Sequence, residues 1–330
     1  MADVRAIWSA LRELRARRPY KTDETAERAD VFGAAMHQFE ELMRAATAVD
    51  YAARPLPLFY AVSQAGRAIT AARGEDPWQL SGHGLKHQLN EPLFRSLVSP
   101  QPGTADSFSR VCEATKSGRL TGPVELGSLW ASLPELYPVD LPEEAWRRPL
   151  RVTPDETPPA LLILRRNMID ATIQGLPNRV FEDLEGEEAD QALRDELAKY
   201  PRSEGWRLRP GPGGGPRLMR NDEYGWDVDV QWPVASPGER ELVTELHAPA
   251  YRSPQDRWLR PVVNEEADPL SPLMTWWGLL YGLSMLARYH PAPWTQSLDV
   301  DRSKWAVPLE VALDEGLEAL PRLVLTSLQQ

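Results

Sequence analysis

The run from Pro269 to Ala287 contains no charged residue, and it constrains the fold of this 330-residue chain more than any other segment. A helix that is apolar on every side needs apolar neighbours all round, either other helices or lipid. The run is nearly long enough to span a bilayer, but it contains serine, threonine, glycine and proline, and acidic residues precede it. We therefore interpret it as a buried helix and expect no membrane partner.

A natural neighbour for this helix starts near Leu58 and continues through FYAVSQAGRAITAARG, with Gly74 as a plausible C-terminal cap. Its alanine and glycine residues allow close approach. Further helical periodicity occurs from Ala26 to Tyr51 and from Val307 to Leu328. Neither terminal set of helices can hide its apolar faces alone, so we predict that the two sets pack together.

Proline and glycine become frequent in the middle of the chain. Extended segments are predicted at Ser107–Glu113, Leu150–Thr153, Ala160–Asn167, Trp206–Arg209 and Arg217–Val234, and helices at Glu125–Leu133 and Glu187–Lys199. The strongest strand signal is the alternation in DVDVQW. We predict an α+β fold, a helical bundle built from residues 1–98 and 266–330 around an inserted strand-rich region, residues 99–265.

The composition limits the function classes. The apolar fraction of 42% and the charged fraction of 26% are those of a soluble globular protein. The formal charge of −11 argues against a broad nucleic-acid-binding surface, although a small basic pocket remains compatible with it. Cys112 is the only cysteine, which excludes an intramolecular disulfide and a thiolate zinc site. The N-terminal segment resembles an amphipathic helix and has no apolar signal-peptide core, so we expect a cytoplasmic protein.

Several catalytic motifs are missing from the sequence. There is no G-x-S-x-G nucleophile elbow, no G-x-G-x-x-G dinucleotide fingerprint and no HExxH. The glycine-rich PGPGGGPR lacks the Lys-Ser/Thr of a phosphate loop. An ordinary hydrolase, dehydrogenase or zinc protease is not indicated, and we predict neither a metal nor another cofactor.

The first candidate site is the QAGR sequence at Gln64, Gly66 and Arg67. If its helix is central, a buried guanidinium there needs an anionic partner. That partner could be the phosphate or carboxylate of a ligand. Alternatively, Arg67 pairs with an internal carboxylate or reaches the surface.

The second candidate is SGHGLKH. Gly82 and Gly84 flank His83, which suggests a tight turn that presents the imidazole. His83 and His87 have the i, i+4 spacing of a helical metal site, but Gly84 disfavours a helix at this point. A loop histidine that is hydrogen-bonded to the backbone is the structural alternative.

The third candidate closes the apolar run at Arg288, Tyr289 and His290. Cations at a helix C-terminus are ordinarily stabilised by the helix dipole. In a functional interpretation, His290 is a general acid or base and Arg288 holds an anion. Trp294 would then cover the site.

The fourth candidate is GERELVTELH. Arg240 and His247 have six residues between them, and helical ribonucleases of the HEPN type use an arginine followed four to six residues later by histidine. This pattern is short, and prolines flank it in the strand-rich middle of the chain.

Four of these segments together resemble one protein family. LPLFYAVSQAGRAITAA, then WQLSGHGL, then SPLMTWWGLLYGLSMLARYHPAPW, and a closing helix ending in LPRLVL are similar, in this order and separation, to the bacterial YaaC-like proteins. The similarity is strongest over Leu56–Leu85 and Ser271–Leu325. It implies a bacterial, cytoplasmic protein and supplies no reaction.

The candidates combine into one hypothesis: a basic pocket for a phosphate-bearing small molecule, nucleotide or nucleic-acid end. The catalytic residues would be His290, His83 and Arg288, and the ligand-binding residues would be Gln64, Arg67, Gly82 and Trp294. A HEPN-like, metal-independent nuclease is its sharpest form, although the spacing at residues 288–290 departs from that pattern. The alternatives are a non-enzymatic ligand-sensing or protein-interaction module, with a protein partner or a second copy, and a purely structural role for these residues.

Overall fold

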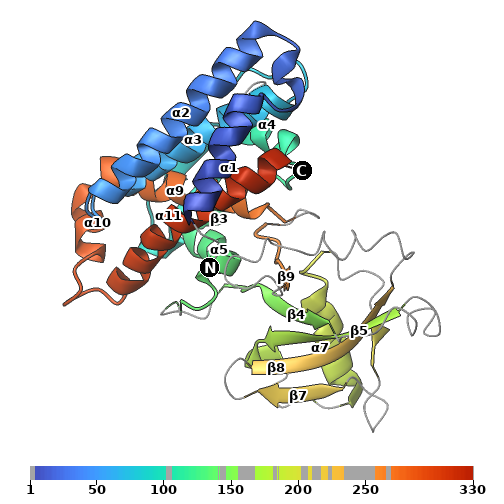
Figure 1. Ribbon diagram of the computed structural model, residues 1–330. Coiled ribbons are helices and arrows are strands. Elements are labelled where there is room, and N and C mark those ends of the chain that lie inside the picture. Colours follow the sequence, from blue (N-terminus) through green and yellow to red (C-terminus); the bar gives the residue numbers. More distant parts are fainter. Residues whose placement is uncertain are drawn as a thin grey trace. The chain divides into compact units, whose positions relative to one another are not determined.

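Figure 1 shows the computed structural model. It describes residues 4–101, 106–139, 141, 146–154, 168–180, 184, 186–201, 207–209, 217–221, 225–233, 257–264 and 269–329. The chain forms two compact units: Met1–Arg147 together with Val263–Gln330 form unit 1, and Arg148–Val262 form unit 2. Residues 99–147, predicted to belong to the strand-rich insertion, thus lie in unit 1.

Unit 1 joins helices from both ends of the chain. Its elements are α1 (Val4–Arg17), η1 (Tyr20–Asp23), α2 (Ala26–Ala48), α3 (Pro55–Arg73), β1 (Leu85–Gln88), η2 (Leu93–Arg95), β2 (Leu97–Pro100), α4 (Ser107–Ala114), β3 (Val124–Glu125), α5 (Leu126–Ala131), η3 (Pro134–Leu136), α9 (Pro272–Tyr289), α10 (Pro291–Ser297) and α11 (Ala306–Gln329). In Figure 1 the first helices, in blue, lie beside α11, in red. The predicted association of N- and C-terminal helices, and with it the α+β class, is confirmed.

The apolar run forms α9, the central helix of unit 1. Ser271 caps its N-terminus by accepting a hydrogen bond from the Met274 N–H, and Pro272 occupies the first turn, where no backbone donor is needed. Every residue from Pro272 to Ser284 is buried. α9 contacts α3, α4, α5, α10 and α11. The prediction that the charge-free run forms a buried helix is confirmed. No helix in the described ranges has both the length and the apolarity needed to cross a bilayer.

The contact between α3 and α9 depends on a glycine. A β-carbon on Gly66 would overlap the six-membered ring of Trp277, which is itself buried. The absence of a side chain lets the α3 backbone lie directly against the indole. The predicted pairing of these two helices is confirmed. α3 begins at Pro55, before the expected start, because proline suits the first turn of a helix.

Unit 1 also contains strands that the sequence did not suggest. β1, β2 and β3 form an antiparallel sheet in that order, so the prediction that residues 1–98 are helical is wrong for β1 and the start of β2. The extended structure predicted for Ser107–Glu113 is also wrong, because this segment belongs to α4. Asp106 caps α4 by accepting the Ser109 N–H at 2.8 Å, and Phe108, Val111 and Cys112 are buried at helical spacing.

The described residues of unit 2 form a six-stranded antiparallel sheet, the α-helix α7 and the short 3-10 helix η4. Its elements are β4 (Leu150–Pro154), β5 (Met168–Leu176), η4 (Asn178–Val180), α7 (Gly186–Leu197), β6 (Arg207–Leu208), β7 (Leu218–Asn221), β8 (Gly225–Pro233) and β9 (Arg257–Leu259). The strand order is β6-β8-β5-β4-β9, with β7 also paired to β8. The DVDVQW alternation appears in β8: Val228 and Val230 join the core with Leu193 of α7, whereas Asp229 accepts a hydrogen bond from the Thr172 hydroxyl.

Most of the other strands and helices predicted for the middle of the chain are present in the structure. Strands at Leu150–Thr153, Trp206–Arg209 and Arg217–Val234 correspond to β4, β6 and the β7–β8 hairpin, and the two middle helices correspond to α5 and α7. Ala160–Asn167 lies outside the described residues.

The Gly66–Trp277 contact yields a stability prediction. Gly66→Ala should lower the free energy of unfolding by about 1–3 kcal/mol, because the added methyl overpacks a site closed by a rigid ring. Gly33→Ala is a matched control on α2, where a β-carbon meets nothing within 4 Å; it should be neutral or stabilise by up to about 1 kcal/mol. Urea denaturation measures both. Equal effects of the two substitutions would contradict this account of the α3–α9 contact.

Candidate functional site

Five polar side chains from separate segments of unit 1 gather where α9 ends, and we call them the histidine corner. They are Tyr60 of α3, His83 in the turn before β1, His87 of β1, Arg288 in the last turn of α9, and His290, which follows that helix.

The turn that carries His83 has the predicted glycine geometry. Gly82 and Gly84 have φ angles of +65° and +77°, which L side chains rarely adopt. A β-carbon on Gly84 would also overlap the carboxylate of Asp106. The turn leaves His83 exposed, with its ring centroid 5.6 Å from that of Phe59 and 6.2 Å from that of Tyr281.

His87 and His290 face each other with ring centroids 6.1 Å apart. β1 alternates between buried and exposed positions, which turns His87 toward the interior with Leu85. Burial, and secondarily the charge of His290, lowers the pKa of His87 to about 4. Its buried Nε2 atom has no hydrogen-bond partner among the residues that the structure describes. Near neutral pH, the His87 imidazole is therefore uncharged and has an unused polar atom.

Arg288 connects the end of α9 to α3. Its Nη1 donates a hydrogen bond to the Tyr60 hydroxyl at 3.3 Å, and its guanidinium lies 5.0 Å from the ring centroid of Tyr289. Both tyrosines are exposed, at 39% for Tyr60 and 58% for Tyr289. Deeper in the corner, the Tyr281 hydroxyl donates to the Leu85 carbonyl at 2.8 Å, which fixes β1 against α9.

The corner contains cationic and imidazole groups without a matching carboxylate. Within the described ranges, His83, His87, Arg288 and His290 form no ion pair with an acidic side chain. Several other arginines of unit 1 do pair with a carboxylate, as Arg54 does with Asp314 and Arg28 with Asp76. In a chain with a formal charge of −11, this makes the corner a local excess of positive charge.

Gln64, Gly66 and Arg67 of the QAGR sequence lie on α3 beyond Tyr60, one to two turns away from the histidine corner. α3 and α9 run in opposite directions, because Tyr60 contacts Arg288 whereas Gly66 contacts Trp277, eleven residues earlier in α9. The seven residues from Tyr60 to Arg67 correspond to a rise of about 10 Å. Arg67 is exposed, so the expectation of a buried guanidinium is wrong and the alternative, that it reaches the surface, holds. Gln64 is half-buried.

Trp294 has a packing role. It is 1% exposed, and its indole N–H donates to the Ala52 carbonyl at 2.8 Å. The indole thereby anchors α10 to the segment that precedes α3. Because its ring is buried and its indole N–H is engaged, Trp294 does not cover the corner as a ligand-binding residue.

The structure tests the metal-binding pattern predicted from the sequence, but not the nuclease pattern. His83 and His87 lie in a turn and a strand, so the helical i, i+4 arrangement is not formed. Among the residues that the structure describes, no three or more His, Cys, Asp or Glu side chains are grouped to hold a metal. Arg240 and His247 fall outside the described residues.

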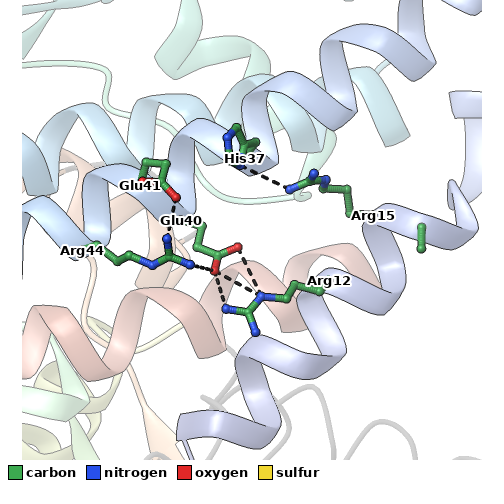
Figure 2. A pocket seen from close by; sticks show the side chains of 7 residues that line it. Arg12, Arg15, His37, Glu40, Glu41 and Arg44 are labelled. Atoms are coloured by element: carbon green, nitrogen blue, oxygen red, sulfur yellow. Dashed lines mark hydrogen bonds and ion pairs between the residues drawn. The ribbon is translucent and has the colours of Figure 1, made fainter.

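A groove between α1 and α2 was not predicted. Arg12, Arg15, Ala16, His37, Glu40, Glu41 and Arg44 line it, and its volume is about 530 Å³. Figure 2 shows these side chains projecting from the two helices into the same space. The signal available in the sequence was the polar face of α1 opposite Ile7 and Leu11, but helical spacing does not reveal which helix lies beside that face.

One known protein family matches nearly the whole chain. A family model described as YaaC-like Protein matches residues 8–328. The chain therefore belongs to the YaaC-like protein family. No curated protein and no solved structure matches the chain.

The depressed pKa of His87 predicts a pH dependence of stability. An unfolded histidine takes up a proton below about pH 6.5, whereas folded His87 resists protonation down to about pH 4. Stability should therefore fall as the pH decreases through this interval, by on the order of 1 kcal/mol from this group after allowance for solvent screening.

Urea denaturation at about pH 7 and about pH 5 tests this expectation. His87→Gln removes the titrating ring, so the variant should lose less stability than the wild type between the two conditions. The other titrating groups are common to both proteins and cancel in the comparison. Identical losses would show that the burial of His87 does not penalise its charged form.

Proposed function

We propose that the histidine corner binds a phosphate-bearing small molecule, with a nucleotide as the best-fitting class. The observation that carries this proposal is the absence of a carboxylate partner for His83, His87, Arg288 and His290 within the described ranges. A cluster of basic groups with no acidic neighbour attracts anions from solution. A ligand phosphate supplies the charge that the corner lacks.

The chemistry of the corner suits such a ligand. The guanidinium of Arg288 donates in a planar fork that matches phosphate oxygens. The half-buried ring of His290, which faces His87, provides a further nitrogen beside the phosphate. The exposed rings of Tyr60 and Tyr289 flank Arg288 and offer flat surfaces for a base.

Phosphodiester cleavage is a second candidate function, supported by the facing imidazoles of His87 and His290. One neutral and one protonated imidazole can serve as base and acid, and Arg288 can stabilise the charge that develops on phosphorus oxygens. In this form the site is a metal-independent nuclease, with His83 available at the exposed edge. Without turnover, the same contacts describe a ligand sensor.

The binding proposal is tested by isothermal titration with AMP and with inorganic phosphate. Arg288→Gln should weaken AMP binding at least about tenfold, because it removes a charged hydrogen-bond donor. Arg302→Gln is the matched control, an exposed arginine whose partner is Asp299, and it should bind like the wild type. If the wild type does not bind AMP or phosphate, or if both variants are equally weakened, the corner is not the site.

Turnover is tested separately by incubating the wild type and His290→Ala with end-labelled RNA, DNA and nucleotides. Cleavage by the wild type that His290→Ala lowers at least about a hundredfold would support acid–base catalysis. Binding without cleavage would support the sensor. Cleavage that His290→Ala leaves unchanged would place the reaction elsewhere or in a contaminant.

A further inference from the structure

The groove between α1 and α2 is separate from the histidine corner and has its own charge pattern. α1 is seated on the bundle by Ile7 and Leu11, which are buried, and by Trp8, whose ring centroid lies 5.4 Å from that of Phe39. These apolar contacts hold the helix in place. The polar side chains that line the groove are therefore not needed as the main attachment of α1.

Both carboxylates in the groove are already engaged. Glu40 accepts hydrogen bonds from Arg12 on α1 and from Arg44 on its own helix, and Glu41 accepts from Arg44 at 2.7 Å. The Arg12 hydrogen bond, opposed by burial, holds the pKa of Glu40 below its ordinary value. Glu40 therefore stays ionised near neutral pH, with its charge directed to two guanidinium groups.

Arg15 and His37 remain at the other end of the groove. They contact each other, with Arg15 Nη1 3.5 Å from His37 Nδ1, and neither has an acidic partner in the described part of the chain. Figure 2 shows the two side chains pointing toward one another from α1 and α2. Two basic groups are thus held in contact at the surface with no carboxylate beside them, an arrangement that a bound anion would complement.

We propose that the Arg15–His37 end of the α1/α2 groove is a binding site for the phosphate group of a small ligand. Phosphate oxygens accept hydrogen bonds from the Arg15 guanidinium and from a ring N–H of His37, whose contact with Arg15 is given up. The groove volume of about 530 Å³ is within the usual range for small-molecule sites and leaves room for the rest of the ligand.

Five charged side chains line the groove beside His37: Arg12 and Arg15 on α1, and Glu40, Glu41 and Arg44 on α2. Because arginines engage both carboxylates, a phosphate at the Arg15–His37 end would meet guanidinium and imidazole groups and no unpaired carboxylate of the groove.

The test is an NMR titration of the full chain with inorganic phosphate at constant ionic strength, following the imidazole resonance of His37. This resonance is assigned by its loss in His37→Gln. The wild type should show a saturable shift, and Arg15→Gln should weaken the affinity at least about tenfold. Arg17→Gln is the matched control, because Arg17 is exposed on the same helix and pairs with Glu13; its titration should equal that of the wild type.

Arg15 is exposed, so both variants should keep the fold, and circular dichroism checks this. If Arg15→Gln loses the fold, Arg15→Lys replaces it and should still weaken binding, since it keeps the charge but loses the fork. A shift that grows linearly without saturation, or one that Arg15 and Arg17 substitutions change equally, would overturn the proposal. Arg288→Gln should leave the His37 titration intact, which separates this site from the histidine corner.

Discussion

The close approach of α3 and α9 at Gly66 and Trp277 is the contact on which the rest of unit 1 depends. It lets a helix from the first quarter of the chain lie directly against one from the last quarter. Because the helices run in opposite directions, the charged end of α9 is brought to the start of α3 and to the strand that follows. Arg288 can then reach Tyr60, and His290 can face His87.

Helix packing also explains why the corner is positively charged. The apolar length of α9 buries everything up to its last turn, so the first polar groups after the run emerge together. The turn between Gly82 and Gly84 places His83 against Phe59 and Tyr281, and the alternation of β1 turns His87 toward His290. Since no described carboxylate pairs with these groups, the fold leaves a positive site in an acidic protein. The proposed phosphate binding follows from this local excess of basic groups over carboxylates.

Much of the fold could be predicted from the sequence because strong hydrophobic patterns dominate it. The charge-free run, the small residues of α3 and the DVDVQW alternation each leave few alternatives. The short strands β1 and β2 were missed because four-residue segments next to helices carry little periodicity. α4 was mistaken for a strand because its polar residues obscured the helical spacing of Phe108, Val111 and Cys112.

The site was harder to predict for a different reason. The sequence identified His83, Arg288 and His290 as candidate site residues from their positions beside glycines and at the end of an apolar helix. It did not reveal which groups face one another in the fold. His87 was considered only as a metal ligand, and its pairing with His290 depends on the pleat of β1 against α9. The burial of Trp294 and the exposure of Arg67 likewise follow from the rotation of each helix about its axis, which tertiary packing decides.

The most direct test of the uncompensated corner is an NMR pH titration of the His87 imidazole resonance, with and without AMP. If the phosphate group supplies the missing negative charge, AMP should raise the pKa of His87 from its value of about 4, and Arg288→Gln should reduce this change. Titration curves that are identical with and without AMP would contradict the account.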